Sequence, residues 1–267
     1  MGTTSKALTL LDYFTRQQHE IGLSDLARLS GTNKATCFRL MAELQDHGLI
    51  EQTAAKSYRI GPAVLRLAAL REATVPTRDA AMPVLQALAR ATGETAHMSH
   101  LVAGRLVTLA FAYAPNHAIK VMMEDADVLP FHATSSGMAV LAHLPKDQQA
   151  STLALPRIGL TPNTMLESGS IQAEMVQVKA VGWAETADTF EVDVASVAVP
   201  LFDCNAACIG AVAVAAPTTR LHGAARADII LRTIKAATEI MSLQGGAAPV
   251  TVQRLWRAIL TQERAPA

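Results

Sequence analysis

A chain of 267 residues is long for one ordinary domain and sufficient for two. Half of its residues are hydrophobic and 4% are aromatic, which indicates a folded, helix-rich protein rather than a disordered one. The 23 Lys and Arg residues balance 23 Asp and Glu residues, so net charge gives no argument for binding nucleic acid or a membrane. Three cysteines are too few for a disulfide framework, and no apolar run reaches the roughly 18 residues of a membrane span. We therefore expect a cytoplasmic protein with no membrane partner.

The first residues show helical periodicity. An apolar stripe predicts a helix over 5–19, and Ser24 is expected to cap a short second helix that Gly31 ends. Asn33 or Thr32 is expected to cap a third helix. Two short helices around a tight, glycine-containing turn form a helix-turn-helix. The expected inward positions of the first two helices are Ala7, Leu8, Leu11, Phe14, Leu26, Ala27 and Leu29.

The third predicted helix has two distinct faces. Its core positions are expected to be Cys37, Leu40, Met41 and Leu44. On the opposite face, small residues near the helix start can approach base edges, and Arg39 can reach a guanine edge or a phosphate. Lys34 is a poor partner for the helix dipole, which a nearby phosphate would explain. The residues of this helix that we expect to meet DNA are Lys34, Ala35, Thr36, Phe38 and Arg39.

A β-hairpin is predicted directly after this helix. Two short β-prone segments, 49–52 and 57–60, flank a polar turn. After a recognition helix such a hairpin is a wing, where Lys56 and Arg59 are suited to backbone contacts, and Tyr58 is included in the expected DNA surface. Helix, helix-turn-helix and hairpin follow the order of a winged helix. The alternative is a small three-helix domain without a DNA function, since periodicity alone does not separate the two.

The run from 22 to 68 resembles the DNA-binding domain of IclR-type transcriptional regulators. That family shows GLS-x-x-x-LA, then PK-S-T-x-x-RLL, and YRLG at the end of the wing. Asn33 stands where Pro is usual and Ala35 where Ser is usual. The resemblance implies double-stranded operator DNA as a partner. The matching positions are Lys34, Thr36, Arg39, Leu40, Leu44, Gly48, Tyr58, Arg59 and Gly61.

A linker helix is expected between the two domains. Pro76 disfavours helix at the residue before it, so 74–77 should divide a helix over 62–72 from one over 82–92. In the resembling family such a helix joins the DNA reader to the sensor and takes part in dimerisation, which implies a homodimer or homotetramer. The expected divisions are 1–61 for the winged helix, 62–78 for the linker, 79–246 for the sensor and 247–267 for a helical extension.

The second domain is predicted to be α+β, with helices packed on one antiparallel sheet. Two of its segments, LPFHATSSGMAVLAHLP and GWAETADTFEVDVASVAVPLFD, resemble the GAF-like effector-binding domain of the IclR family, so the resemblance covers about 5–243. The expected strands are 95–102, 105–113, 119–123, 194–202 and 208–216, and the expected helices are 135–143, 170–181 and 223–243.

The start of the helix at 135 is the expected effector site. Free backbone N–H groups and the helix dipole at such a start favour a carboxylate or phosphate, so we expect a small carboxylate effector. The alternative is that the serines only cap the helix. Met138, Thr186 and Ser196 replace the family's usual Lys, acidic residue and Cys, which leaves the ligand's identity open. By position, the resemblance implies Ser135, Ser136, Gly137, Thr186, Asp188 and Ser196 as effector-binding residues.

Two other functions compete with an effector-responsive regulator. His132, Ser135 and one of several acids could be assembled into a hydrolase triad, but no G-x-S-x-G elbow is present and the acid is arbitrary. The other alternative is a DNA-binding scaffold without a ligand. We expect no enzyme activity and no cofactor.

No metal site is expected either. His97 and His100 lie three apart on a predicted strand and should face opposite sides, and Cys204 and Cys208 flank a turn without nearby histidines.

An apolar stripe marks the predicted helix over 251–262. We favour packing of this helix against the chain's own sensor, and a contact between subunits is the alternative. The stripe consists of Val252, Leu255, Trp256 and Ile259.

Overall fold

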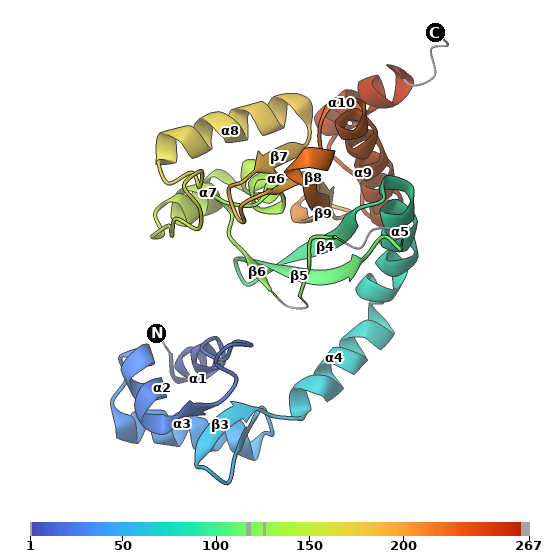
Figure 1. Ribbon diagram of the computed structural model, residues 1–267. Coiled ribbons are helices and arrows are strands. Elements are labelled where there is room, and N and C mark those ends of the chain that lie inside the picture. The colour runs from blue at the N-terminus through green and yellow to red at the C-terminus, as the bar shows by residue number, and fades with distance from the viewer. Residues whose placement is uncertain (1, 116–118, 125–126, 263–267) are drawn as a thin grey trace. The chain divides into compact units, whose positions relative to one another are not determined.

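The computed structural model describes residues 2–115, 119–124 and 127–262. The chain forms two compact units that divide between Pro76 and Thr77 (Figure 1). No helix in the described part of the chain is long and apolar enough to cross a membrane.

The first unit is a winged helix. Its three strands form a sheet in the order β1-β3-β2, and both strand pairs are antiparallel. The strand β1 was not predicted, because Ile21 and Gly22 read as a helix breaker. The elements are α1 (Thr3–Leu11), β1 (Ile21–Gly22), α2 (Leu23–Ser30), α3 (Lys34–Asp46), β2 (Ile50–Gln52), β3 (Ser57–Ile60) and α4 (Ala63–Thr74).

The turn between α2 and α3 follows the sequence prediction closely. Gly31 ends α2 in the left-handed region, with φ of 63°. Asn33 caps α3, because its side-chain oxygen accepts a 2.8 Å hydrogen bond from the backbone N–H of Thr36. The prediction of a Ser24 cap is wrong, since the N-cap of α2 is Gly22 and no side chain caps it.

Unit 1 has its own hydrophobic core, to which α3 contributes the four expected side chains. The first helix is shorter than predicted and ends at Leu11 rather than near residue 19. Within it Leu10 is buried, whereas Leu8 is 50% exposed, so the predicted inward position of Leu8 is wrong. Leu29 at 38% exposure is likewise only marginally covered. The core residues are Leu10, Ile21, Leu26, Cys37, Leu40, Met41, Leu44, Ile50 and Tyr58.

The helix α4 carries no buried side chain within the single chain. Its leucines Leu65, Leu67 and Leu70 are 74%, 46% and 56% exposed. The next helix, α5, begins at Thr77 rather than at residue 82 and continues through Pro83. Proline removes one helical hydrogen bond but does not end this helix, because its apolar face is buried against the sensor.

The second unit contains one six-stranded antiparallel sheet, as predicted for an α+β sensor. The strand order is β6-β5-β4-β9-β8-β7. The β4–β5 hairpin turns at Ala103 and Gly104, whose φ angles of 48° and 78° suit a tight primed turn. The strand predicted over 119–123 is wrong, because the chain there is irregular and β6 pairs with β5 instead. The strands are β4 (Thr95–Val102), β5 (Arg105–Ala112), β6 (Val128–Leu129), β7 (Ala184–Ala187), β8 (Val194–Phe202) and β9 (Cys208–Pro217).

Helices cover both faces of this sheet (Figure 1). On one face α9 contacts α5 and the sheet, and its Arg226 forms a 2.6 Å ion pair with Glu185 of β7. On the other face α6 contacts β7, β8 and β9, and α8 packs on α6. The short helix α7 was not predicted. The helices are α5 (Thr77–Thr92), α6 (Ser135–His143), α7 (Lys146–Leu153), α8 (Ser168–Val181), the 3-10 turn η1 (Thr218–Arg220), α9 (Gly223–Leu243) and α10 (Val250–Gln262).

The C-terminal helix α10 packs on its own sensor, as favoured from the sequence. Val252 and Trp256 are buried, while Leu255 and Ile259 are partly buried against the same core. The indole N–H of Trp256 donates a 2.7 Å hydrogen bond to the carbonyl oxygen of Gly182, where α8 ends. The helix is therefore an integral part of the sensor core.

Candidate DNA-binding surface and ligand cavity

The outward face of α3 presents the residues expected to meet DNA. Lys34, Ala35, Phe38 and Arg39 are exposed, and Thr36 is half-buried beside the Asn33 cap. Phe38 is 56% exposed, which is unusual for an aromatic side chain in a folded domain. The face combines small residues at the helix start with a cation one turn further on, so a base edge could approach it closely.

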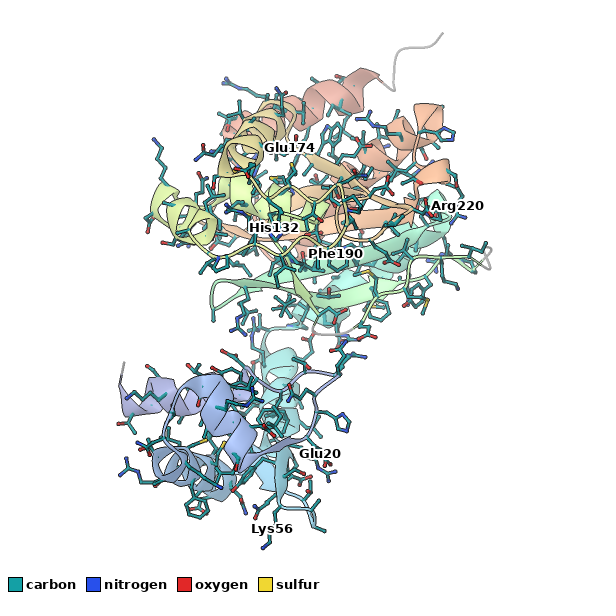
Figure 2. All side chains as sticks on the ribbon, turned by 60° about the vertical axis from the view of Figure 1, so that its left-hand side comes forward. Glu20, Lys56, His132, Glu174, Phe190 and Arg220 are labelled. Atoms are coloured by element: carbon teal, nitrogen blue, oxygen red, sulfur yellow. The ribbon has the colours of Figure 1, made fainter. Side chains whose placement is uncertain are left out.

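The wing supplies a second cation to the same unit. Lys56 lies at the tip of the turn between β2 and β3 with φ of 61°, and Figure 2 shows its side chain directed outward. Within the described part of the chain, no ion pair holds Lys34, Arg39 or Lys56. These three side chains can therefore meet phosphates without first breaking a salt bridge.

Two predicted wing residues are placed differently. Tyr58 is only 3% exposed and packs in the winged-helix core, where burial raises the pKa of its phenol. Its predicted contact with DNA is therefore wrong for the side chain. Arg59 is exposed but already paired, at 2.6 Å from Glu51 and 3.7 Å from Glu20. A phosphate would have to compete with these carboxylates for Arg59.

The second candidate site is a cavity in the sensor, between the sheet and the start of α6. About 60 Å³ is available there to the centres of water molecules, enough for a few waters or a very small ligand. The register of the sheet builds its floor, because Thr186, Ser196, Ala215 and Thr95 are direct neighbours across four strands. All but Thr95 line the cavity, and His97, two residues further along β4, lines it as well.

Four of the predicted effector residues meet in this cavity. The hydroxyl of Ser196 lies 2.7 Å from that of Ser135 and 3.2 Å from that of Thr186, so strand and helix share one hydroxyl cluster. The hydroxyl of Ser136 lies 3.2 Å from Nε2 of His97. The expected grouping of α6 with the strand after the acidic motif therefore holds geometrically.

Gly137 and Asp188 do not line the cavity. The N–H of Gly137 donates a 2.9 Å hydrogen bond to the side chain of Thr134, which is the N-cap of α6. A Cβ at position 137 would lie 2.5 Å from the backbone of Phe131, so glycine is needed for close packing. The carboxylate of Asp188 accepts a 2.6 Å hydrogen bond from the N–H of Asp193 and so shapes a turn.

The cavity carries little charge. Burial lowers the pKa of His97 to about 4, so its imidazole is neutral near pH 7. Glu191 is the one acidic residue among the described lining residues, and no Lys or Arg is among them. Apart from Glu191, the polar groups around the cavity are hydroxyl groups, amides at the start of α6 and a neutral imidazole.

Several lining residues lie outside the predicted set. Val121, Met122 and Met123 come from the irregular segment that was predicted to be a strand, and Phe190 follows the acidic motif. The sequence of this apolar segment does not indicate that it forms a cavity wall. Its position depends on side-chain contacts from residues distant in the sequence.

The polar residues considered for a metal site do not form one. His97 is buried beside Ser136, whereas His100 lies further along β4. Among the described residues, no group of three or more His, Cys, Asp or Glu side chains could hold a metal ion.

A winged helix with unpaired outward cations, joined in one chain to an antiparallel sensor with a polar cavity, defines the class of one-component DNA-binding regulators. Comparison with known families gives the same result. The model of the IclR helix-turn-helix domain matches residues 3–54, and that of the bacterial transcriptional regulator IclR C-terminal domain matches residues 70–242. The chain therefore belongs to the IclR family of transcriptional regulators.

Individual relatives extend over most of the chain. The HTH-type transcriptional regulator XynR of Escherichia coli K12 is 26% identical, over 85% of this chain and 90% of its own length. The glycerol operon regulatory protein of Streptomyces griseus is 29% identical, over 81% and 85%. These relatives are named as regulators rather than as enzymes, which counts against the hydrolase alternative.

Solved structures of the same family match as well. An IclR transcriptional regulator structure from Silicibacter sp. TM1040 has 49% identity and a TM-score of 0.91, covering 94% of this chain and 99% of that one. An IclR homologue from Microbacterium hydrocarbonoxydans, complexed with 4-hydroxybenzoate, has 20% identity and a TM-score of 0.72 over 91% and 99%.

Proposed function

We propose that the protein regulates transcription in the cytoplasm by binding operator DNA through α3 and the wing, and that a small ligand in the sensor cavity modulates this binding. The observation that supports DNA contact most directly is the outward face of α3, where Lys34 and Arg39 are exposed and hold no carboxylate. Basic side chains at the start of a recognition helix and on a wing contact phosphates, and one of them reads base edges.

Replacing Arg39 with Ala tests the reading face. If Arg39 makes a bidentate contact to a guanine, Arg39→Ala should weaken specific operator binding by about 1–3 kcal/mol. Lys34→Ala should instead weaken binding to all sequences and reduce the salt dependence by about one phosphate contact. Fluorescence anisotropy with the protein's own upstream DNA measures both. The control is Arg254→Ala on the exposed side of α10. Unchanged operator affinity in Arg39→Ala would show that the assigned face is wrong.

A homodimer or homotetramer is the proposed assembly. The leucines of α4 are exposed in the described part of the first unit, and a second copy is the partner that supplies the same apolar face by two-fold symmetry. Two winged helices would then meet the two half-sites of a pseudo-palindromic operator. Leu65→Lys together with Leu70→Lys should lower the mass measured by light scattering, and an unchanged mass would place the interface elsewhere.

A small monocarboxylate is the proposed effector. The first amides of α6 have no acceptor within the helix, and hydroxyls of Ser135, Ser136 and Ser196 surround that helix start. The absence of Lys and Arg from the described lining argues against a ligand with several negative charges. The bound 4-hydroxybenzoate of the Microbacterium homologue is a hydroxylated monocarboxylate.

The effector proposal is tested with matched ligands. Small monocarboxylates should raise the melting temperature of the sensor, whereas the corresponding amides should not. Ser196→Leu should abolish this shift and spare DNA binding without ligand, while Ser151→Leu on the exposed side of α7 should change neither. If no carboxylate alters either melting or operator binding, the monocarboxylate proposal is wrong, and a DNA-binding scaffold without a ligand becomes the better explanation.

A further inference from the structure

The irregular segment 119–124, here called the strap, forms one wall of the sensor cavity through Val121, Met122 and Met123. It has no regular secondary structure, so no strand ladder fixes its position. Met122 is 69% exposed although it also lines the cavity, which places the strap between the cavity and solvent.

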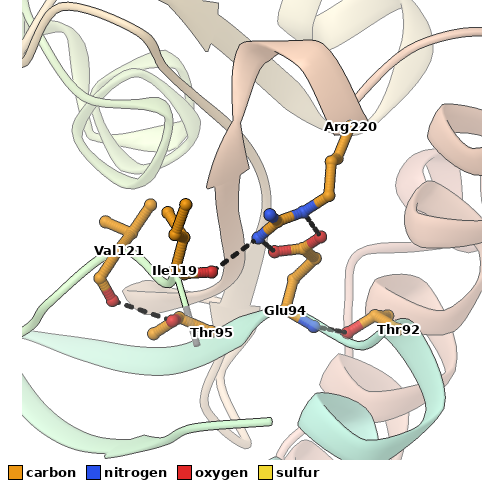
Figure 3. A network of polar contacts seen from close by, with 6 residues as sticks. All are labelled: Thr92, Glu94, Thr95, Ile119, Val121 and Arg220. Carbon is orange, nitrogen blue, oxygen red and sulfur yellow. Dashed lines mark hydrogen bonds and ion pairs between the residues drawn. The ribbon is translucent and has the colours of Figure 1, made fainter. Parts of the chain in front are cut away.

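Side chains from elsewhere in the sensor hold the strap by its backbone. Arg220 donates a 3.0 Å hydrogen bond to the carbonyl oxygen of Ile119, and the Thr95 hydroxyl donates one of 2.8 Å to the carbonyl oxygen of Val121 (Figure 3). The hydroxyl of Tyr113 both donates to the carbonyl oxygen of Met123, at 3.1 Å, and accepts from its N–H, at 3.0 Å. Alternate residues of the strap are therefore tied to three separate side chains.

An ion pair fixes the first of these side chains. Both carboxylate oxygens of Glu94 accept from the guanidinium of Arg220, at 2.5 and 2.7 Å. Glu94 is 4% exposed and immediately precedes β4, and Arg220 ends the turn η1 after β9. The pair thus joins the ends of two central strands, and a further N–H of the same guanidinium donates to the strap (Figure 3).

Thr95 connects this network to the cavity floor. It is fully buried and neighbours Ala215 in the same row of the sheet as Ser196 and Thr186. Floor and strap are therefore linked through one hydroxyl, and a ligand that pushes the wall outward must stretch the bond between Thr95 and Val121.

We propose that Arg220, with Glu94, and Tyr113 are positioning residues that hold the strap closed over the cavity and thereby limit the size and entry of its ligand. This inference rests on the proposed ligand site. It also gives that site a movable wall, which a ligand larger than the present cavity would need.

Access to the cavity can be measured without knowing the ligand. In a Cys204→Ser background, which removes the exposed thiol, Ser196→Cys places a thiol on the cavity floor. Iodoacetamide, followed by mass spectrometry of peptides, reports how often the strap opens. Cys208, which is buried in β9 and does not line the cavity, reports opening of the sheet in the same sample.

Tyr113→Phe keeps the ring and removes both hydrogen bonds to Met123. Each neutral hydrogen bond lost should raise the open fraction about 2- to 10-fold, so labelling at position 196 should accelerate by about 5- to 100-fold in this variant. Glu94→Gln combined with Arg220→Gln removes the ion pair without leaving a buried charge. This double variant should also accelerate labelling at position 196. Labelling of Cys208 should stay unchanged.

The matched control is Arg232→Gln, which removes a 2.6 Å Arg–carboxylate ion pair on α9, away from the strap. If Tyr113→Phe does not accelerate labelling at position 196, or accelerates Cys208 equally, the proposal is overturned, and Tyr113 decides the matter even if the double variant does not fold. Because the assay needs neither DNA nor an effector, its failure is distinguishable from failure of the proposed regulatory function.

Discussion

The hydrogen bond between Trp256 and Gly182 predicts how strongly α10 supports the sensor. Trp256 is 3% exposed, and its ring packs on the main sensor core. Trp256→Ala should therefore cost about 3–5 kcal/mol, the usual loss for a large buried aromatic side chain. Trp256→Phe keeps most of the packing but leaves the buried carbonyl oxygen of Gly182 without its 2.7 Å donor, at a cost of about 1–3 kcal/mol.

These costs convert into melting temperatures. For a domain of this size each kcal/mol lowers the midpoint by roughly 2–4 °C, so Trp256→Ala should melt about 6–20 °C below the parent protein. Differential scanning calorimetry of the full chain resolves the sensor transition, and near-ultraviolet circular dichroism confirms which unit unfolds. Arg254→Ala, exposed on the same helix, should stay within about 0.5 kcal/mol of the parent.

The order of the three variants is the critical result. Packing and hydrogen bonding together predict that stability falls from Arg254→Ala through Trp256→Phe to Trp256→Ala. If Trp256→Ala had the same melting temperature as Arg254→Ala, α10 would not contribute to the sensor core. Contact between subunits would then be the better explanation for its apolar stripe. Deleting residues 247–267 should likewise lower the stability of the sensor and leave the oligomeric state in solution unchanged.

Three further predictions concern buried groups. Gly137→Ala should destabilise the sensor by about 1–3 kcal/mol, because the new Cβ would overlap backbone atoms; an unchanged urea midpoint would contradict this packing. His97 is neutral when folded, with its pKa lowered to about 4, so the unfolded chain takes up its proton first and stability should fall by about 2–3 kcal/mol as pH drops from 6.5 toward 4.5. His97→Gln should flatten that slope in denaturant titrations, and an identical slope would assign it to other groups. Cys204 is exposed whereas Cys37 and Cys208 are buried with raised thiol pKa values, so Ellman's reagent should react with Cys204 alone in the native protein, and labelling of either buried thiol would argue against the packing described.

The elements that the sequence predicts well are those with a local physical cause. The caps at Gly31 and Asn33 and the four buried positions of α3 follow from helix chemistry within a few residues. The hairpin turn at Ala103 and Gly104 follows from turn chemistry, and β4 and β8 follow from runs of β-prone residues. The family motifs then connect these pieces into a winged helix and a sensor.

The errors arise where distant residues decide the structure. The segment 119–123 has a strand-like composition, but Arg220, Thr95 and Tyr113 hold it as an irregular wall. Tyr58 matches a family motif on the wing, but β1 pairs with β3 at this residue, and its side chain is buried in the winged-helix core. Periodicity could not place Leu8 outside and Leu10 inside, because α1 ends several residues earlier than its apolar pattern.

In the candidate effector site, motif position predicts Ser135, Ser136, Thr186 and Ser196 as effector-binding residues, and all four line one cavity. Gly137 and Asp188 belong to the same motifs but serve the backbone of the helix start and a turn. A motif therefore predicts which segments lie near the site. Which of their side chains face the cavity depends on the position of each residue in its helix or strand.

That register has a consequence for how such a sensor can change. On β8 and β9 the cavity-lining Ser196 and Ala215 alternate with Val197 and Val214, which are buried on the opposite face of the sheet, so cavity lining and core packing fall to different positions of the same strands. Among the described residues of β9, Ala215 is the one that lines the cavity. Exchanging a few residues in one row could therefore retune chemical preference while the hydrophobic layer behind it, and with it the folded state, stays intact. Substitutions on one face of the sheet can therefore change ligand preference, while those on the other face change stability.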